Sequence, residues 1–294
     1  MFSLVITTFN EPKTLERLLL SIKKAKFKEE YKVFVVAPDE NSKKVVAKFP
    51  EVRFLRDKGK GKPSALNFAL KYLKGDIAVF TDGDIYFKGG SVEKLILHLR
   101  KNPELGAVSG RPVPINKRDN FFGFLAHFLT FSAHQWRKKA SALGEYFDCS
   151  GYLFACYKDI IPFLPEDCLA EDSYISSWIF KKGYKIGYVE QGVVFVKFPT
   201  NLSDWLCQKT RTITGQRQIR RVKEFKDLKT RSLFEEIKQG VWLLFIFPRN
   251  IKEFFWLILL CFLRLYVWIK SFFVLKFRKE KDIWKRVETT KNNL

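Results

Sequence analysis

The sequence predicts an α/β fold with an open, mostly parallel sheet and helices on both of its faces. The chain has 294 residues and is 47% hydrophobic, which allows a large core and excludes a disordered protein. Short apolar runs alternate with amphipathic segments over the first 110 residues. This β-α-β-α order is typical of parallel sheets, whose ligands gather at the carboxyl ends of the strands.

In the first half, each predicted strand is a short apolar run and each predicted helix has apolar residues on one face. Pro12 fits the first turn of the first helix because its missing N–H is not needed there. The expected strands are residues 2–7, 31–37, 52–55, 76–81 and 106–110. The expected helices open at Glu11-Pro12, at residues 41–48, after the basic glycine loop 58–64, and at residues 92–99.

From about residue 111 the pattern changes to longer elements. Aromatic residues dominate an expected helix at 121–138, and an expected helix at 202–223 is basic. Between them we expect a strand at 147–157, a helix at 171–182, and strands at 185–189 and 193–198.

The C-terminal part favours contact with a membrane. Residues 254–275 are mostly apolar, and about 33 Å of helix is long enough to cross a bilayer core. Arg264 would cost about 3 kcal/mol at the bilayer centre unless it snorkels. Residues 241–248 are too few to span and look interfacial, and basic residues flank the apolar run on both sides. A full span, a helix within one leaflet, a hairpin and a buried aromatic helix all remain open.

Charge and cysteine content narrow the class of protein. Lys and Arg number 53 against 31 Asp and Glu, a net charge of +22, which favours a polyanionic partner such as nucleic acid, an anionic membrane or a phosphorylated ligand. The five cysteines form no Cys-x-x-Cys pair, which argues against a disulfide framework and a structural zinc site. The N-terminus lacks the features of a signal peptide, so we expect the cytoplasm or the cytoplasmic face of a membrane. Walker A and Gly-x-Ser-x-Gly motifs are absent from the sequence.

Two pairs of acids carry the strongest chemical signal. Asp82-Gly-Asp84 follows an apolar strand, and hard carboxylate oxygens there suit Mg²⁺ or Mn²⁺ on a diphosphate. A surface turn is the alternative, since Asp-Gly is a common turn dipeptide. Glu171-Asp172 opens a predicted helix, where it indicates either a general base or a helix cap.

Cations and loops complete the candidate site. Gln208 and Arg211 share a helix face, and a cation there can stabilise a departing diphosphate or form a basic surface. The loop 59–64 offers backbone amides and Lys62 to phosphates. Thr7 to Glu11 and Asp39 follow the first two strands, at the expected ligand edge.

In this order the motifs resemble glycosyltransferase family 2, over about residues 1–216. Val5-Ile-Thr-Thr-Phe-Asn-Glu11 looks like the family's opening strand and nucleotide loop, and Lys62-Pro-Ser-Ala-Leu-Asn67 is similar to its Gly-Lys-x-x-Ala-Leu-Asn segment. Asp82-Gly-Asp84 matches the Asp-x-Asp motif, and Glu171-Asp172 the base motif. Gln208-x-x-Arg211 matches part of Gln-x-x-Arg-Trp, although Thr212 replaces the Trp that stacks on the acceptor sugar in polysaccharide synthases.

The resemblance implies an inverting GT-A fold hexosyltransferase that uses a nucleoside-diphosphate sugar, with UDP expected before GDP. It implies a catalytic domain over 1–223, with a nucleotide-sugar half at 1–110 and an acceptor half at 111–223, followed by a membrane-associating part at 224–294. The implied acceptor is a lipid or lipid-linked glycan at an anionic membrane, on its cytoplasmic face. Thr212 in place of Trp favours a single transfer over processive synthesis.

The resemblance also implies a role for each site residue. Asp172 would be the base with Glu171 supporting it, Asp84 would ligate Mg²⁺ or Mn²⁺ directly, and Asp82 would contact the ribose or the metal shell. Arg211 would stabilise the leaving diphosphate. The implied nucleotide-sugar ligands are Thr7, Glu11, Asp39, Lys62, Asn67, Asp82, Gln208 and Arg211.

Two alternatives remain beside the enzyme. A nucleic-acid-binding protein would explain the basic charge, but the chain lacks a recognisable nucleic-acid-binding motif and its basic residues flank an apolar tail. A degenerate transferase fold kept as a membrane-binding or scaffold protein would not need Asp82, Asp84, Asp172 and Arg211 to be intact.

Overall fold

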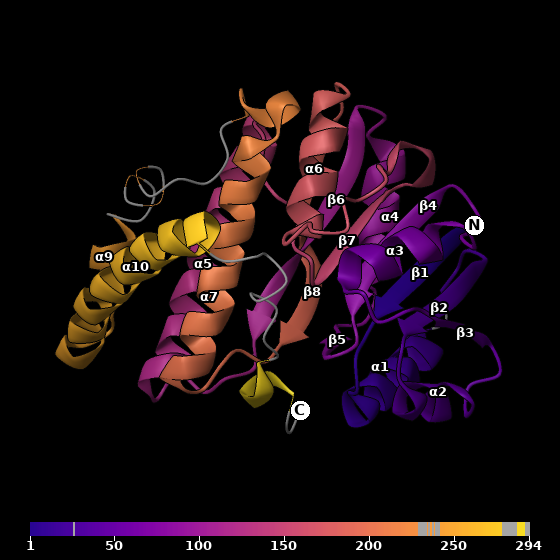
Figure 1. The fold of residues 1–294 in the computed structure, drawn as a ribbon, viewed down its shortest axis with the longest axis horizontal. Coiled ribbons are helices and arrows are strands. Elements are labelled where there is room, and N and C mark those ends of the chain that lie inside the picture. Colours follow the sequence, from indigo (N-terminus) through magenta and orange to yellow (C-terminus); the bar gives the residue numbers. More distant parts are fainter. Residues whose placement is uncertain are drawn as a thin grey trace.

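The structure is a computed structural model that describes residues 1–25, 27–228, 234, 236, 238, 242–277 and 287–291. One sheet organises these residues, with the strand order β3-β2-β1-β4-β7-β6-β8-β5 (Figure 1). Its strands are β1 Phe2–Thr7, β2 Tyr31–Ala37, β3 Val52–Arg56, β4 Ile77–Asp82, β5 Ile85–Phe87, β6 Leu105–Pro114, β7 Leu153–Tyr157 and β8 Lys185–Val196. The helices of the first 225 residues are α1 Pro12–Ala25, α2 Glu40–Val46, α3 Lys62–Leu70, α4 Ser91–Lys101, α5 Phe121–Leu143, α6 Glu171–Lys181 and α7 Leu202–Arg221, and the short 3-10 turns there are η1 Lys158–Ile160 and η2 Lys223–Phe225.

The sheet is mixed, with parallel pairing dominant in its first half. β1 pairs in parallel with β2 and β4, β2 with β3, and β6 with β8. β7 runs antiparallel between β4 and β6, and β5 runs antiparallel to β8 at the edge. The predicted α/β class is confirmed, and the antiparallel strand β7 joins the two parallel groups.

Alternation along the central strands explains why helices cover both faces. In β1, Phe2, Leu4 and Ile6 join the core beneath α1 and α4, whereas Val5 joins the core beneath α3 and α6. Successive side chains of a strand point to opposite faces, so an uninterrupted apolar run requires cover on both. The strand is fully buried as a result.

Three predicted elements differ from the structure. The strand expected at 147–157 is confined to β7 at Leu153–Tyr157, and Gly151 before it makes a close backbone contact with Asp172. The two strands expected at 185–189 and 193–198 form the single strand β8, whose pairing with β6 shifts register between Tyr188 and Val193. The three-residue strand β5 was missed because it follows Asp84 directly and is too short to show alternation.

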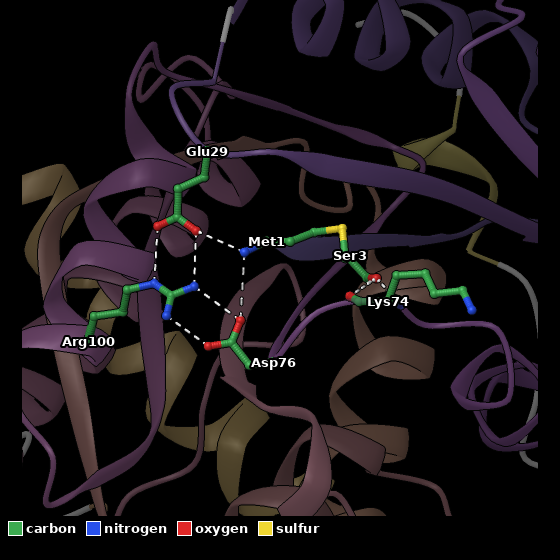
Figure 2. A network of polar contacts seen from close by, with 6 residues as sticks. All are labelled: Met1, Ser3, Glu29, Lys74, Asp76 and Arg100. Atoms are coloured by element: carbon green, nitrogen blue, oxygen red, sulfur yellow. Dashed lines mark hydrogen bonds and ion pairs between the residues drawn. The ribbon is translucent and has the colours of Figure 1, made fainter.

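A cluster of ion pairs lies at the amino-terminal edge of the sheet, where β1 and β4 begin (Figure 2). The Arg100 guanidinium forks between Asp76, at 2.7 Å, and Glu29, at 3.0 Å, and the α-amino group of Met1 lies 3.6 Å from Glu29. The Ser3 hydroxyl donates to the carbonyl of Lys74 at 2.7 Å. These contacts fasten the start of β1 to the chain entering β4.

Two C-terminal helices, α9 Leu243–Ile246 and α10 Ile251–Phe277, pack against α5 and α7. Along α10 the buried positions recur every three or four residues, as on one face of a helix. That inner face contains polar groups with partners on the protein. Glu253 accepts from Arg118 at 2.7 and 3.0 Å, and Arg264 donates to Glu236 at 2.6 Å through two nitrogens.

The opposite side of α10 carries exposed apolar side chains. This outer face comprises Phe254, Phe255, Ile258, Leu259, Phe262, Leu265, Tyr266, Ile269, Phe272 and Phe273. By length and composition, Ile251–Lys276 qualifies as a possible membrane-crossing helix, with a mean hydropathy of 2.0 over its best window. The interfacial stretch predicted at 241–248 contains α9, while its first residue lies outside the described residues, as do the flanking cations Lys229, Arg231, Arg278, Lys279, Lys281, Lys285 and Arg286.

Candidate active site

The carboxyl ends of β1, β2 and β4 bring the first group of candidate residues together. Thr7 at the end of β1 is in register with Asp82 at the end of β4, and its hydroxyl donates to Asp82 Oδ1 at 3.3 Å. Asp39 follows β2 and caps α2 through the Ser42 amide at 2.8 Å. The edge predicted to bind ligand therefore carries acids from separate parts of the chain.

The glycine between Asp82 and Asp84 is required by a close approach. A Cβ at position 83 would lie 2.6 Å from the Cβ of Thr8, which is nearer than real side chains come. The Gly83 amide donates to the Thr7 carbonyl at 3.0 Å, so the turn is pressed against the end of β1. Both acids thereby stay at the sheet edge, as their spacing predicted.

Lys62 links the two acid pairs. Its Nζ lies 2.7 Å from Asp82 and 2.6 Å from Glu171, which come from β4 and α6. Burial disfavours charge on Lys62, but the two carboxylates outweigh it, so the pKa of the ammonium is raised. The lysine is thus a permanent cation that ties the metal motif to the helix bearing the predicted base.

Asp172 opens α6 and accepts two backbone hydrogen bonds. The Gly151 amide donates to Oδ2 and the Ser173 amide to Oδ1, both at 2.9 Å. Gly151 is suited to this contact because a Cβ there would press on Asp172 Oδ2 at 3.0 Å. Burial, together with the charge of Glu171, raises the pKa of Asp172 to about 7. A carboxylate with that pKa is well matched to accept a proton near neutral pH.

Glu11 contributes another buried acid. It accepts from the Thr8 hydroxyl at 3.1 Å, and burial and the charge of Asp84 raise its pKa to about 7. The Lys291 ammonium forms ion pairs with both Glu11 and Asp84, and its Nζ lies 2.6 Å from Asp84 Oδ2. Lys291 comes from the C-terminal end of the chain, so the sequence placed only two of these three groups at the site.

Asn67 and Asp39 are engaged in local structure. The Asn67 side chain donates to the Leu164 carbonyl at 2.8 Å and accepts from the Leu164 amide at 2.9 Å, which uses both ends of its amide. The Asp39 carboxylate also accepts from the Asn10 amide at 2.9 Å. Both residues shape the walls of the site in this structure, and direct contact of either with a nucleotide stays a prediction.

Helix α7 presents the remaining predicted residues. Gly215 packs α7 against the chain before Glu171, since a Cβ there would lie 2.8 Å from the Cβ of Ala170. The Gln208 Oε1 atom is buried with no hydrogen-bond partner among the described residues, as a ligand-binding amide would be. Arg211 lies near Tyr152, whose pKa is raised by burial, by Asp84 and by Asp82, and is lowered by Arg211. Arg211 and the Asp82–Asp84 pair therefore both act electrostatically on Tyr152.

The donor set fits a hard divalent cation. Mg²⁺ in such sites takes one or two carboxylates together with phosphate oxygens of the substrate and water. Asp82 and Asp84 supply such oxygens, although in the described residues no group of three His, Cys, Asp or Glu forms a cage that would hold a metal alone. The site therefore fits a cation that arrives with, and is completed by, a diphosphate.

Two residues of the site were missed from the sequence. Tyr152 precedes β7, and its neighbourhood follows from the antiparallel pairing of β7 with β4, which an apolar run does not reveal. Lys291 lies in a polar stretch without a motif, more than 200 residues from its partners Glu11 and Asp84. No local sequence signal would have found it.

The mixed sheet, with acids at the carboxyl ends of its first strands, is that of the GT-A fold. The family model "Glycosyl transferase family 2" matches residues 3–161, more than half of the chain. The chain therefore belongs to glycosyl transferase family 2.

Relatives of known structure and name agree with this class. A poly-β-1,6-N-acetyl-D-glucosamine synthase of Staphylococcus aureus is 22% identical over 253 residues, covering 81% of this chain and 61% of its own length. The chain thus spans about three fifths of that curated relative. A mannosyltransferase from Pyrobaculum calidifontis, solved with GDP-Man and Mn²⁺, aligns with a TM-score of 0.65 at 19% identity over 94% of this chain and 86% of its own. S. aureus TarS with UDP aligns with a TM-score of 0.51 at 16% identity, over 82% and 70% of the two chains.

Proposed function

We propose that this protein transfers a sugar from a nucleoside-diphosphate sugar, UDP-linked before GDP-linked, to a lipid or lipid-linked glycan, with inversion at the anomeric carbon. The observation that carries the proposal is the Lys62 bridge between Asp82 and Glu171, because it sets the diphosphate end of the site beside the helix of the base. The pKa of Asp172 near 7 supports a base that works at neutral pH.

Each residue has a defined task in this mechanism. Asp84, with Asp82, would hold Mg²⁺ or Mn²⁺, and the bound cation would neutralise charge on the diphosphate. Arg211 and Lys62 add positive charge on the protein side, where Arg211 would stabilise the departing diphosphate. The acceptor hydroxyl attacks the anomeric carbon of the donor sugar as the bond from that carbon to the diphosphate breaks. A carboxylate oxygen of Asp172 accepts the proton of that hydroxyl. Thr7, Glu11 and Asp39 line the nucleoside end, as the family resemblance implies.

We also propose that α9 and the outer face of α10 lie in the cytoplasmic surface of an anionic membrane. The supporting observation is the distribution of polar and apolar side chains on α10. Glu253 and Arg264 bond to protein partners on the packed face, whereas Phe and Leu side chains are exposed on the outer face. Water would favour the reverse arrangement, whereas lipid favours this one. Residues 201–294 hold 21 Lys and Arg against 9 acids, which adds attraction to anionic lipid. A helix in one leaflet agrees better with the packed inner face than a full span does.

Binding of the donor is the first test. Calorimetry with UDP and with GDP, each with Mn²⁺ or Mg²⁺, should show one nucleotide binding in a metal-dependent way. A screen of nucleoside-diphosphate sugars that follows nucleotide release, with membrane extract as acceptor, should then identify the sugar. Absence of affinity for both nucleotides with both metals would contradict the proposal.

Membrane attachment can be tested with surface variants, one on the outer face of α10 and a control on α4. Phe255 and Phe262, exposed by 62% and 66%, are replaced together by Asp, and flotation with vesicles containing phosphatidylserine is measured. The variant should leave the vesicles, because two charges would enter the hydrocarbon boundary. Leu97→Asp on α4, where the side chain is exposed by 53%, is the control and should float as the wild type does. Equal flotation of all three proteins would contradict membrane docking.

A further inference from the structure

Residues 287–291 lie against the active site and are held there by specific contacts. The Thr289 amide and hydroxyl donate at 2.8 and 2.7 Å to Oδ2 of Asp204, which lies in the first turn of α7. The Thr200 amide donates to the Thr289 hydroxyl at 3.3 Å. The Val287 and Thr290 side chains are buried. The short turn η4, Glu288–Thr290, lies below the lower end of β8 in Figure 1.

These anchors deliver the Lys291 ammonium to the carboxylates of the candidate cation site. Its Nζ lies 2.6 Å from Asp84 Oδ2, and it also pairs with Glu11. The side chains are largely shielded from water, with 20% of Lys291, 10% of Asp84 and 6% of Glu11 exposed. An ammonium in this position neutralises the oxygen that the proposed function assigns to a divalent cation.

The ammonium and a divalent cation cannot share this oxygen at full strength. Mg²⁺ binds carboxylate oxygens at about 2.0–2.1 Å, well inside the 2.6 Å contact that Lys291 makes with Asp84. Two cations within a few ångströms of each other also repel strongly where water is excluded. The site must therefore release one before it accepts the other.

We propose that residues 287–291 form an autoinhibitory segment, in which Lys291 occupies the cation site and withdraws when a divalent cation binds with the donor diphosphate. This inference rests on the proposed donor and metal site. The segment lowers the apparent affinity for the cation by the fraction of molecules in which the site is open. By linkage, the cation and the diphosphate together favour the open state.

Three variants test the competition through metal affinity, measured by calorimetry with Mn²⁺ in the presence of saturating UDP or GDP. Lys291→Met removes the ammonium and keeps an apolar stem, and it should tighten Mn²⁺ binding by about 5- to 150-fold, the usual range of coupling between sites. Thr289→Val removes the anchoring hydroxyl at Asp204 without changing charge, and it should tighten binding in the same direction. Lys48→Met removes an exposed lysine paired with Glu16 at 2.9 Å, so it matches the charge change and should bind Mn²⁺ as the wild type does.

A second measurement follows the segment itself in the unaltered protein. Hydrogen exchange at the Thr289 amide should be slow in the free protein and faster with Mn²⁺ and UDP, or with Mn²⁺ and GDP, because its bond to Asp204 is lost. Equal Mn²⁺ affinity of the wild type, Lys291→Met and Thr289→Val, with unchanged exchange, would overturn the autoinhibitory segment and leave the metal site standing. Absence of Mn²⁺ affinity in all the proteins, with or without nucleotide, would overturn both.

Discussion

The two ends of the strands, which form the amino-terminal and carboxyl edges of the sheet, differ in their balance of charge. At the amino-terminal edge, the Arg100 guanidinium and the α-amino group face Glu29 and Asp76, so cations and acids are matched. Burial opposes the charge on Asp76 and is the largest single influence, but the hydrogen bonds it accepts and the charges of Arg100 and the α-amino group together outweigh burial, so the pKa of Asp76 is lowered. At the carboxyl edge, Lys62 and Lys291 face a larger group of acids, namely Glu11, Asp82, Asp84, Glu171 and Asp172.

This difference in charge balance distinguishes contacts that hold two chain segments together from a site that binds a ligand. Matched charges satisfy one another and hold two segments together, whereas a surplus of buried carboxylates raises the free energy of each charged form. The pKa values of Glu11 and Asp172 rise to about 7 for this reason, with burial as the largest cause. A further cation relieves the surplus, which is what a metal-dependent site requires. Each of the following predictions changes the charge balance at one of the edges.

The largest effect is expected for Asp172→Asn. The amide keeps the shape of the side chain but cannot accept the proton of the acceptor, and kcat should fall by about 10²- to 10⁴-fold. Calorimetry should show unchanged donor affinity, because the proposed mechanism assigns Asp172 to the acceptor. Asp159→Asn, at a side chain exposed by 86%, is the matched control. Normal transfer by Asp172→Asn would show that another group is the base.

A smaller loss is expected when the surplus itself is reduced. Asp84→Asn should weaken Mn²⁺ binding in the presence of nucleotide by at least about 10-fold, the loss that outer-shell changes alone commonly cause. Asp76→Asn makes the same change at the matched edge and should leave Mn²⁺ affinity as it is. If both variants bind Mn²⁺ equally well, the metal assignment at Asp84 is wrong.

The pH dependence should reveal the raised pKa of Asp172. Below pH 7 the charged form declines about tenfold per unit, so kcat/KM should fall on the acid side of a midpoint near 7. Stability should move in the opposite direction. Because the pKa in the folded protein lies above the ordinary value of 3.8, proton binding by Asp172 favours the fold at low pH, and this contribution is lost as the pH rises through 7.

Denaturation at pH 5 and pH 8 checks the sign of the stability effect. The wild type should lose more stability between the two values than Asp172→Asn, which has no carboxyl group to titrate at that position. An equal loss in both proteins would show that Asp172 titrates with an ordinary pKa.

The smallest effect is expected at the amino-terminal edge. Arg100→Met should lower the free energy of unfolding by about 0–1 kcal/mol, because the partners in Figure 2 are partly exposed and screened. Mn²⁺ affinity and transfer should be unchanged. Urea denaturation gives the first quantity, and a loss of metal binding in this variant would show that the two edges are coupled.

Much of the sheet was predictable because burial imposes a simple pattern on its strands. The bounds of β1 and β2 coincide with the predicted runs, since β1 is buried along its whole length and β2 is buried and apolar from Val33 onward. β8 was divided in two because Glu190, Gln191 and Gly192 look like a turn, whereas the structure accommodates them by a register shift beside β6. Pairing between strands compensates for local polarity, and a single sequence does not contain that information.

The candidate site was likewise predictable where local sequence determines position, and not where contacts join remote segments. Asp82, Asp84, Glu171 and Asp172 were found because short motifs place them at ends of elements, where geometry follows from the fold. The Lys62 bridge and the Lys291 contact depend on distances between remote segments. Their roles in catalysis, and the division of the chain at residue 223, stay predictions.

Because α5, α7 and α9 cover the inner face of α10, only its outer face can enter the membrane proposed above. A helix about 10–12 Å across that is covered by protein on one side can sink only about half its width into a bilayer. In the proposed orientation it would act as a shallow wedge, displacing headgroups in one leaflet and leaving the other undisturbed. Such a wedge enters most easily where lipids are loosely packed or the surface is convex. The curvature of the membrane would then influence how much enzyme it carries.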